Sequence, residues 1–356
     1  MAIITLNKAS LKHNFDYLNQ RLLSYNKSWG IVTKLLCGNE KFLNEVVDLN
    51  PVEVLDSRMS NLEKLQKLAP DIQRVYIKPP PINSIKRLVS CADVSFNTHI
   101  NTILKIDEEA RDKSVIHKII IMVELGDLRE GVMRDNIMEF YSKVFELKNI
   151  EVIGLGTNLN CLNGILPSLD KLIQLSLYKE LINAKFNSNI KWVSAGTSVT
   201  LPLLPKKQVP AGNNHFRIGE TLYFGNDIMN DRPIRKMRQD VFVLRAEVIE
   251  IRTKPVVASG EQGQNMMGEQ PNIELEQLGE NSVRALLDVG VLDVLPKYLI
   301  PISKYVKIVG SSSDILVVDI GKNPEKLKLG DYISFRPNYN GVLSLMNSKY
   351  IDKEVI

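Results

Sequence analysis

The chain has 356 residues, of which 44% are hydrophobic and 24% charged, and its formal net charge is +4. This hydrophobic content is typical of a soluble globular protein, and the length exceeds the usual range of a single domain. Lysine and arginine alternate with aspartate and glutamate without a block of like charge, so the charge pattern does not indicate a nucleic-acid partner. We therefore expect one large globular domain and a smaller one.

The sequence also lacks the features of membrane and secreted proteins. No apolar run approaches the roughly 20 residues that a membrane-spanning helix needs, and the first residues do not have the pattern of a secretion signal. The three cysteines, Cys37, Cys91 and Cys161, are widely spaced and odd in number, which argues against a disulfide framework. We expect a cytoplasmic protein that does not associate with membranes.

Short apolar segments alternate with segments of helical spacing through about the first 235 residues. The expected strands cover residues 3–6, 30–33, 52–57, 74–78, 93–97, 118–124, 151–157, 191–195 and 216–224. Nearly continuous apolar strands that alternate with helices indicate a parallel sheet. The repeat of a closed (β/α)₈ barrel fits this series better than an open doubly wound sheet, since no Gly-x-Gly-x-x-Gly follows the first strand.

The pattern changes near residue 239. Strands with turns at regular spacing are expected at residues 241–251, 284–289, 305–309, 315–319, 331–336 and 341–346. Such spacing indicates an antiparallel β domain, and the charged, proline-containing connector 232–238 precedes it. We predict an α/β protein with a TIM-type (β/α)₈ barrel at residues 1–235 and a smaller C-terminal antiparallel β domain at residues 236–356.

Lys34 ends an apolar strand and is followed by the turn residues Gly38 and Asn39. Burial of an unpaired ammonium is costly, so Lys34 is either the first solvated residue after the strand or a reactive amine. A lysine with a lowered pKa could form a Schiff base with an aldehyde cofactor. The residues at the other strand ends bear on this choice.

Two of those strand ends have the chemistry of a phosphate site. Residues 196–198 offer backbone N–H groups and the hydroxyls of Thr197 and Ser198, and residues 218–220 offer further N–H groups where Gly219 permits close approach. Small-residue turns are common in themselves. Catalytic groups of a barrel cluster at the C-terminal ends of its strands, so the joint placement of these turns with Lys34 is more specific for a phosphate site than either turn alone.

Several stretches match, in order along the barrel, the motifs of one family. The sequence resembles the alanine racemase superfamily of fold-type III pyridoxal phosphate (PLP) enzymes, and most closely its ornithine racemase branch. The matching stretches are residues 4–14, 32–39, 123–131, 154–158 with Cys161, 194–198 and 216–225.

The resemblance implies roles for individual residues. Lys34 would bind PLP and exchange a proton with one face of the substrate Cα. Arg217 would face the pyridine nitrogen, and because a guanidinium keeps its proton, that nitrogen would stay unprotonated. Arg129 would lie near the phenolic oxygen of the cofactor and Asn158 beside its ring. The residues implied around the phosphate are Thr197, Ser198, Gly219, Glu220 (through its backbone) and Tyr223.

The sequence departs from the family pattern at two tyrosines. The tyrosine that alanine racemases carry four positions after the lysine is Gly38 here, and no tyrosine lies in residues 260–265, where the partner subunit supplies the second acid/base. Cys161 is a candidate for that role, because a thiol can exchange protons near neutral pH when its pKa is lowered. It could equally be a small buried hydrophobe. His215 and Asp293 are weaker candidates.

Substrate choice is expected to come from the C-terminal domain of a second subunit, so the resemblance also implies a homodimer. Residues 310–314 align with a substrate-contacting segment of alanine racemases. Ser313 and Asp314 would there receive the distal ammonium of a diamino acid, since a buried cation requires a partner. A solvated turn aspartate is the alternative reading of Asp314.

We therefore expect a PLP-dependent racemase that interconverts L- and D-amino acids by removal and return of the Cα proton, with ornithine or another basic amino acid as substrate. The alternatives are a non-enzymatic PLP-binding protein, which would lack the second domain, or a related enzyme acting on another small amino acid. No metal site is expected, because no histidine or cysteine follows His215.

Overall fold

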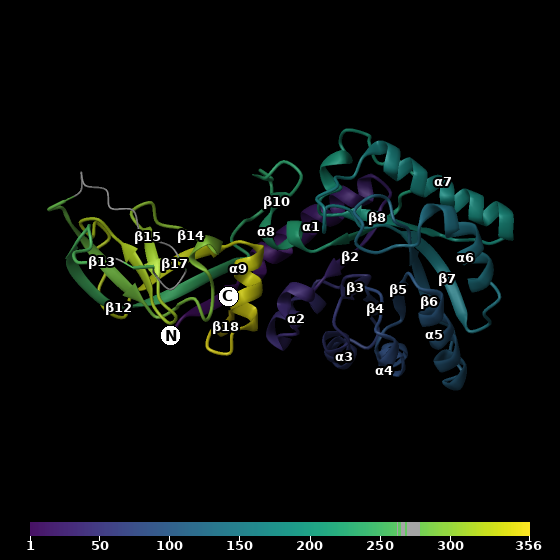
Figure 1. Cartoon of the computed structure of the whole chain (residues 1–356), viewed down its shortest axis with the longest axis horizontal. Helices are drawn as coiled ribbons and strands as arrows, with labels where there is room; N and C mark the ends of the chain where they lie inside the picture. The colour runs from purple at the N-terminus through teal and green to yellow at the C-terminus, as the bar shows by residue number, and fades with distance from the viewer. Residues whose placement is uncertain (262, 265–267, 269–277) are drawn as a thin grey trace. The chain divides into compact units, whose positions relative to one another are not determined.

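The computed structural model describes residues 1–261, 263–264, 268 and 278–356. The chain divides into two compact units (Figure 1), one formed by Ala9–Gln239 and the other by Met1–Lys8 together with Asp240–Ile356. Each unit has its own hydrophobic core and is described separately below.

The first unit is a closed barrel of eight parallel strands in chain order. The register closes at Ile31, which pairs with Val54 on one side and Ile218 on the other. The strands are β2 Ser28–Val32, β3 Glu53–Asp56, β4 Gln73–Tyr76, β5 Val94–Asn97, β6 His117–Met122, β7 Ile150–Gly156, β8 Trp192–Thr197 and β9 His215–Ile218. The predicted (β/α)₈ barrel is thereby confirmed.

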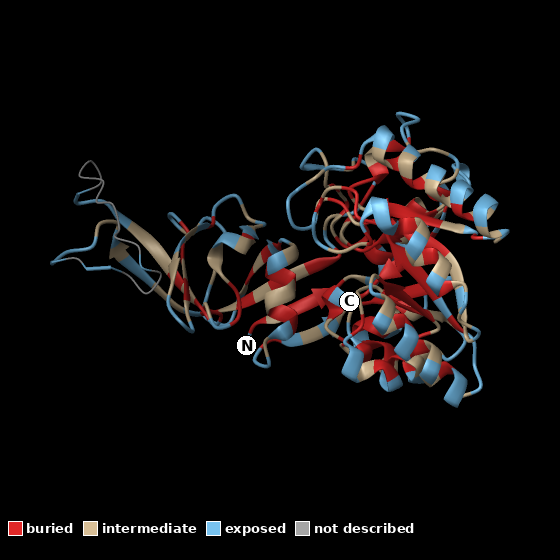
Figure 2. Cartoon of the chain, turned by 45° about the vertical axis from the view of Figure 1, so that its right-hand side comes forward, coloured by how far each residue is buried: buried red, intermediate tan, exposed pale blue. Residues whose placement is uncertain are grey.

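Helices surround this barrel and bury apolar residues on their inner faces. The helix α2 begins where the side chain of Asn39 accepts a hydrogen bond from the N–H of Phe42, a usual N-cap arrangement. The buried strands and inner helix faces form the core (Figure 2). The helices are α1 Lys8–Ser24, α2 Glu40–Val47, α3 Met59–Leu68, α4 Ile85–Cys91, α5 Ile100–Asp112, α6 Ile137–Val144, α7 Leu169–Phe186 and α8 Glu220–Phe224.

The second unit is built on one long strand, β12, which pairs with β1, β13 and β17. All pairings in this sheet are antiparallel except that of β1 with β18. The predicted antiparallel β domain is confirmed. Its strands are β1 Ile3–Leu6, β12 Phe242–Pro255, β13 Asn281–Leu287, β14 Leu299–Pro301, β15 Lys307–Ser311, β16 Leu316–Asp319, β17 Tyr332–Pro337 and β18 Asp352–Val355.

The N-terminal strand corrects the predicted domain boundary. Residues 3–6 do not belong to the barrel, because β1 pairs with β12 and β18 of the second unit. The boundary accordingly lies between Gln239 and Asp240 rather than after residue 235. A four-residue apolar strand fits either sheet, so only the long-range hydrogen bonds decide where it belongs.

Two predicted strands were wrong in type. Residues 341–346 belong to the helix α9 (Tyr339–Asn347), whose N-terminus is capped by Asn338 and whose buried residues include Val342, Leu345 and Met346 at helical spacing. The segment predicted as one strand at 216–224 ends as a strand at Ile218 and continues as α8. In both places a short apolar run concealed the helical period.

Candidate active site

Lys34 lies at the C-terminal end of β2, where a tight turn fixes the backbone and leaves the side chain exposed. The preceding Thr33 donates from its N–H to Leu55 at 2.9 Å and from its hydroxyl to Asp56 at 2.9 Å. Leu35 and Leu36 are buried on the other side of the turn. Across the described parts of the chain, the Lys34 ammonium has neither a hydrogen bond nor an ion pair.

The carboxylate that holds this turn, Asp56, is fully buried. Burial raises its pKa, while hydrogen bonds from Arg58 N–H, Asn61 and Thr33 oppose that shift. Asp56 therefore joins the turn that carries Lys34 to the start of α3. Its role as an anchor was not anticipated from the sequence.

Arg217 is buried inside the barrel opening at the end of β9 and donates four hydrogen bonds from its terminal nitrogens. Nη1 reaches the carbonyl and the hydroxyl of Ser194, both at 2.6 Å. Nη2 reaches the carbonyl of Thr157 at 2.9 Å and the side chain of Asn158 at 2.6 Å. Burial lowers the pKa of Arg217 to about 10, so the guanidinium remains charged at neutral pH. The remaining donor, Nε–H, has no protein acceptor among the described residues.

Asn158 and Arg129 belong to the same hydrogen-bonded network as Arg217. The amide nitrogen of Asn158 donates to Glu130, and Glu130 in turn forms an ion pair with Arg129. The hydrogen bond that Arg129 itself donates to Glu130 raises the pKa of Arg129, while burial acts in the opposite direction. The three residues predicted around the cofactor ring are thus brought together. Glu130 itself was missed, although an acid directly beside a predicted cofactor arginine is a signal for it.

Cys161 is exposed in the loop that follows β7. The buried carboxylate of Asp127 holds this loop by accepting backbone hydrogen bonds of 2.9–3.3 Å. Burial alone would raise the pKa of Asp127, but the four N–H donors outweigh it and lower that pKa. The donors are the N–H groups of Cys161, Leu162, Asn163 and Ile165. Cys161 is therefore an accessible thiol on an anchored loop and not a core residue.

The two predicted phosphate loops meet each other. The Ser198 hydroxyl accepts a hydrogen bond of 3.2 Å from the N–H of Thr221. Gly219 packs on β2, where a Cβ would lie 3.0 Å from the carbonyl oxygen of Val32. The N–H of Thr197 is already used by the Thr200 hydroxyl at 3.3 Å.

The first residues of α8 extend this region toward Lys34. Burial raises the pKa of the Glu220 carboxyl, and the positive charge of Lys34 opposes that shift. The two side chains therefore interact electrostatically across adjacent strands. Tyr223 is only 1% exposed and packs as a core side chain of α8.

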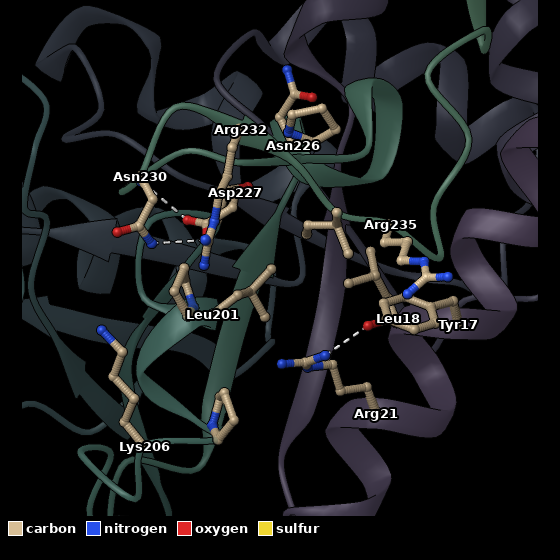
Figure 3. A pocket seen from close by; sticks show the side chains of 15 residues that line it. Tyr17, Leu18, Arg21, Leu201, Lys206, Asn226, Asp227, Asn230, Arg232 and Arg235 are labelled. Carbon is tan, nitrogen blue, oxygen red and sulfur yellow. Dashed lines mark hydrogen bonds and ion pairs between the residues drawn. The ribbon is translucent and has the colours of Figure 1, made fainter.

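Ser198 also borders a cavity of about 420 Å³ on the barrel unit (Figure 3). Its walls come from α1, the loop after β8 and the β10–β11 hairpin (Asn226–Asp227 and Arg232–Pro233). Cationic side chains outnumber acidic ones in this lining, which favours anions near the loop that carries Ser198. The charged lining residues are Arg21, Lys206, Arg232, Arg235 and Asp227.

The two weaker candidates for the second acid/base are each engaged by residues of their own unit. His215 is fully buried in the barrel interior, with Nδ1 2.7 Å from the hydroxyl of Ser194 and Nε2 in contact with Glu53. Both of its ring nitrogens are therefore occupied. Asp293 lies in the second unit and accepts a hydrogen bond of 2.6 Å from the Ser348 hydroxyl.

The predicted substrate residues lie in an exposed turn of the second unit between β15 and β16. The hydroxyls of Ser312 and Ser313 donate to the Asp314 carboxylate at 3.1 and 3.2 Å. No cation neutralises Asp314 within the part of the second unit that the structure describes. Asn265, in the loop compared with the tyrosine-bearing loop of alanine racemases, falls outside the described residues.

The described residues contain neither a metal-binding cluster nor a membrane-spanning helix. No group of three or more histidine, cysteine, aspartate or glutamate side chains there could hold a metal ion. No helix in the same residues has the length and apolar character needed to cross a membrane.

The sequence profile of the family described as alanine racemase, N-terminal domain, matches residues 6–227. The chain belongs to this family. It is 31% identical over 354 residues to an ornithine racemase from Acetoanaerobium sticklandii, which covers 99% of both chains. It is 30% identical over 322 residues to a lysine racemase from Thermotoga maritima, covering 90% of this chain and 89% of the relative.

Solved structures of alanine racemases have the same fold. The enzyme from Bartonella henselae, described with covalently bound pyridoxal phosphate, superposes with a TM-score of 0.75 at 16% identity, covering 100% of this chain and 99% of that one. The enzyme from Streptomyces coelicolor A3(2) superposes with a TM-score of 0.76 at 13% identity, covering 99% and 97%. The barrel followed by a β domain is therefore the architecture of these enzymes.

Proposed function

We propose that this chain is a PLP-dependent racemase of a basic amino acid, with ornithine as the first choice of substrate. The observation that carries the proposal is that two side chains at the C-terminal ends of barrel strands, Lys34 and Arg217, each keep a nitrogen free for a ligand. The Lys34 ammonium has neither a hydrogen bond nor an ion pair among the described residues. Arg217 uses every Nη proton but keeps its Nε–H for an acceptor.

These residues fit the groups of PLP by their chemistry. An exposed primary amine suits an aldehyde, and a donor that cannot lose its proton suits a pyridine nitrogen. The loops of Ser198 and Gly219, which meet at the Thr221 N–H, supply hydroxyl and backbone donors of the kind that bind phosphate. When bound there, PLP would supply an electron-withdrawing ring that makes the substrate α-proton acidic.

The chain's own residues would then move one proton across the substrate Cα. Lys34 would take or return it on one face, as the amine at the end of β2. On the other face we assign Cys161, whose exposed thiol lies on the loop that Asp127 anchors. A two-base reaction needs donors on opposite faces, and Cys161 lies on a different loop from Lys34.

Arg129 and Asn158 would line the cofactor ring through the network that Glu130 completes. Because Arg217 remains charged, it would disfavour a protonated ring nitrogen and so limit the electron withdrawal of the ring. That limit favours simple removal and return of a proton over reactions that need a longer-lived carbanion.

The choice of a basic substrate rests on the relatives and on one exposed carboxylate. The relatives at 31% and 30% identity are an ornithine racemase and a lysine racemase. We assign recognition of the distal ammonium to Asp314 of the partner subunit, with Ser313 of the partner subunit beside it, in a homodimer. In this chain Asp314 accepts hydrogen bonds from neutral hydroxyls, so its negative charge remains available to a cation.

The test begins with purified protein incubated with pyridoxal phosphate and reduced with borohydride. A pyridoxyl label on Lys34 is expected, together with its loss in Lys34→Ala and its retention in Lys105→Ala, an exposed lysine on α5. Exchange of the α-proton is then followed in deuterated water for the L- and D-forms of ornithine, lysine and alanine. Label without exchange of any of these would favour a PLP-binding protein that is not a racemase.

Two further variants test the assigned residues. Cys161→Ala should abolish racemisation while exchange from one enantiomer persists, because Lys34 still serves one face. Asp314→Ala should shift the preference from ornithine toward alanine. Full racemisation by Cys161→Ala would exclude the thiol, and an unchanged substrate preference would exclude Asp314.

A further inference from the structure

A line of buried polar side chains runs through the barrel interior below Arg217. The Ser194 hydroxyl accepts a hydrogen bond from Nη1 of Arg217 at 2.6 Å and lies 2.7 Å from Nδ1 of His215. On the other side of the ring, Nε2 of His215 contacts Glu53. Ser194 and His215 are 0% exposed and Glu53 is 2% exposed. The line thus joins a cation near the rim to a carboxylate deep in the barrel.

The geometry around the buried end of this line is closely constrained. Trp192 stacks on the His215 ring with centroids 4.4 Å apart and planes 8° from parallel. Gln73 donates to the second oxygen of Glu53 at 2.9 Å. A Cβ at Gly30 would overlap the Glu53 side chain, so the absence of a side chain at this position of β2 leaves the room that Glu53 occupies.

The protons of the line can be assigned by counting donors. Arginine only donates, so the Ser194 oxygen is the acceptor toward Arg217. The single hydroxyl proton of Ser194 then goes to Nδ1 of His215, since the hydroxyl has no other hydrogen-bond acceptor among the described residues. A histidine that accepts at Nδ1 carries its proton at Nε2, which faces Glu53. Every hydrogen bond therefore runs in one direction, from Arg217 to Glu53.

The two ends of the line carry opposite charges. A buried guanidinium is costly unless a counter-charge compensates it. Burial lowers the pKa of Arg217, and of the two carboxylates that oppose this shift Glu130 acts more strongly than Glu53. Glu130 lies near the exposed rim, whereas Glu53 is the counter-charge below.

We propose that Glu53 and His215 are positioning residues that act through Ser194 to hold the guanidinium of Arg217 in one orientation, with Nε–H left toward the cofactor ring. The inference rests on the proposed function for the identity of that ring. The restraint on Arg217 is nevertheless a property of the chain before any cofactor binds. The restraint and the proposed function can therefore be tested separately.

The first test uses cofactor-free protein labelled with ¹⁵N-arginine, with Arg217→Gln to assign the signals. In the wild type we expect separate Nη signals for Arg217 that are protected from exchange with water. Ser194→Ala and His215→Gln should speed the exchange of these protons with water, because the first removes one of the four hydrogen bonds of the guanidinium and the second removes the histidine that orients the Ser194 hydroxyl. Glu53→Gln keeps the shape of the side chain and an acceptor oxygen, so it should fold and show a smaller loss of protection.

The matched control is His117→Gln. His117 is also a buried barrel histidine, and it lies 2.9 Å from the hydroxyl of Ser95 on the neighbouring strand. None of its hydrogen bonds leads to Arg217, so the Arg217 signals should stay as in the wild type. Protected, unchanged signals in all three variants of the line would overturn the proposal, as would equal losses in His117→Gln.

The second test uses the protein loaded with pyridoxal phosphate. Ser194→Ala and His215→Gln should weaken the induced circular dichroism of the bound cofactor and lower kcat about tenfold, with KM changed less than about twofold. The double variant should be no worse than the poorer single one, because both cut the same line. Additive losses, or wild-type dichroism and kcat in both single variants, would contradict positioning. Wild-type protein that takes up no pyridoxal phosphate would refute the proposed function while the arginine signals still report on the restraint.

Discussion

The side-chain oxygen of Asn158 accepts a hydrogen bond of 2.6 Å from Nη2 of Arg217, which joins the end of β7 to β9 across the barrel opening. The amide nitrogen of the same side chain donates to Glu130. An amide can do both because it carries an acceptor and two donors. Asn158 thus links a buried cation to an acid at the rim without adding charge of its own.

Replacement of Asn158 should therefore destabilise the barrel. Asn158→Leu leaves one guanidinium donor of Arg217 without a partner and removes one of the two hydrogen bonds to the Glu130 oxygen that Arg129 also contacts. We expect this loss to lower the free energy of unfolding by about 1–3 kcal/mol. Urea unfolding followed by fluorescence measures the change. Asn44→Leu, on the exposed side of α2, is the control. Equal unfolding midpoints for the two variants would contradict the structural role of Asn158.

Asp127 should determine the order of the loop that carries Cys161. Asp127→Asn replaces one acceptor oxygen by an amide that faces backbone donors, so hydrogen exchange at residues 161–165 should speed up about tenfold or more, as expected for the loss of roughly one hydrogen bond to a charged group. Asp135→Asn, an exposed change in the same unit, should leave that exchange unaltered.

The effect of Asp127→Asn should also depend on pH. The folded-state pKa of Asp127 is lowered, so its stabilising contribution is complete above the unfolded-state value of about 3.9 and is lost as the pH falls through the lower folded-state value. The difference in unfolding free energy between wild type and Asp127→Asn should accordingly shrink at acid pH. A difference that grows toward low pH would show that folding does not lower the pKa of Asp127.

His117 should make the folded chain sensitive to acid. Burial lowers its pKa from 6.5 to about 4, so the unfolded chain takes up a proton in this interval and the folded chain does not. Stability should be complete above pH 6.5 and should fall by about 3 kcal/mol as the pH is lowered to about 4. His117→Gln should remove this part of the pH dependence, whereas His13→Gln, at an exposed histidine, should retain it.

Gly196 is required for packing and not for a left-handed backbone. A Cβ at this position would overlap the ring of Phe216 on the adjacent strand. Gly196→Ala should cost about 1–3 kcal/mol through overpacking, while Gly310→Ala, which meets open space, should be close to neutral. Phe216→Leu should offset part of the loss when combined with Gly196→Ala, and a purely additive double variant would argue against the overlap.

Much of the barrel could be predicted because its strands are apolar on both faces and because the residues at their ends are chemically distinctive. The segment 118–124 reads as a buried strand without any knowledge of its neighbours. Lys34 is conspicuous for a similar reason, since a lysine that ends such a strand stands out against an apolar background. These are local properties, which can be recognised from a segment of a few residues.

The partners of each buried polar group were decided only by the tertiary structure. Arg217 bonds to residues 23 and 59–60 positions away, and His215 contacts Glu53 162 positions away. The assignment of β1 to the second unit rests likewise on pairing with residues about 240 positions later. Local sequence sets the spacing of apolar residues and the polarity of each segment. Closure of the barrel determines which donors and acceptors lie in the same buried space. A buried charge requires a partner in that space, and no pattern along the chain predicts which residue it is.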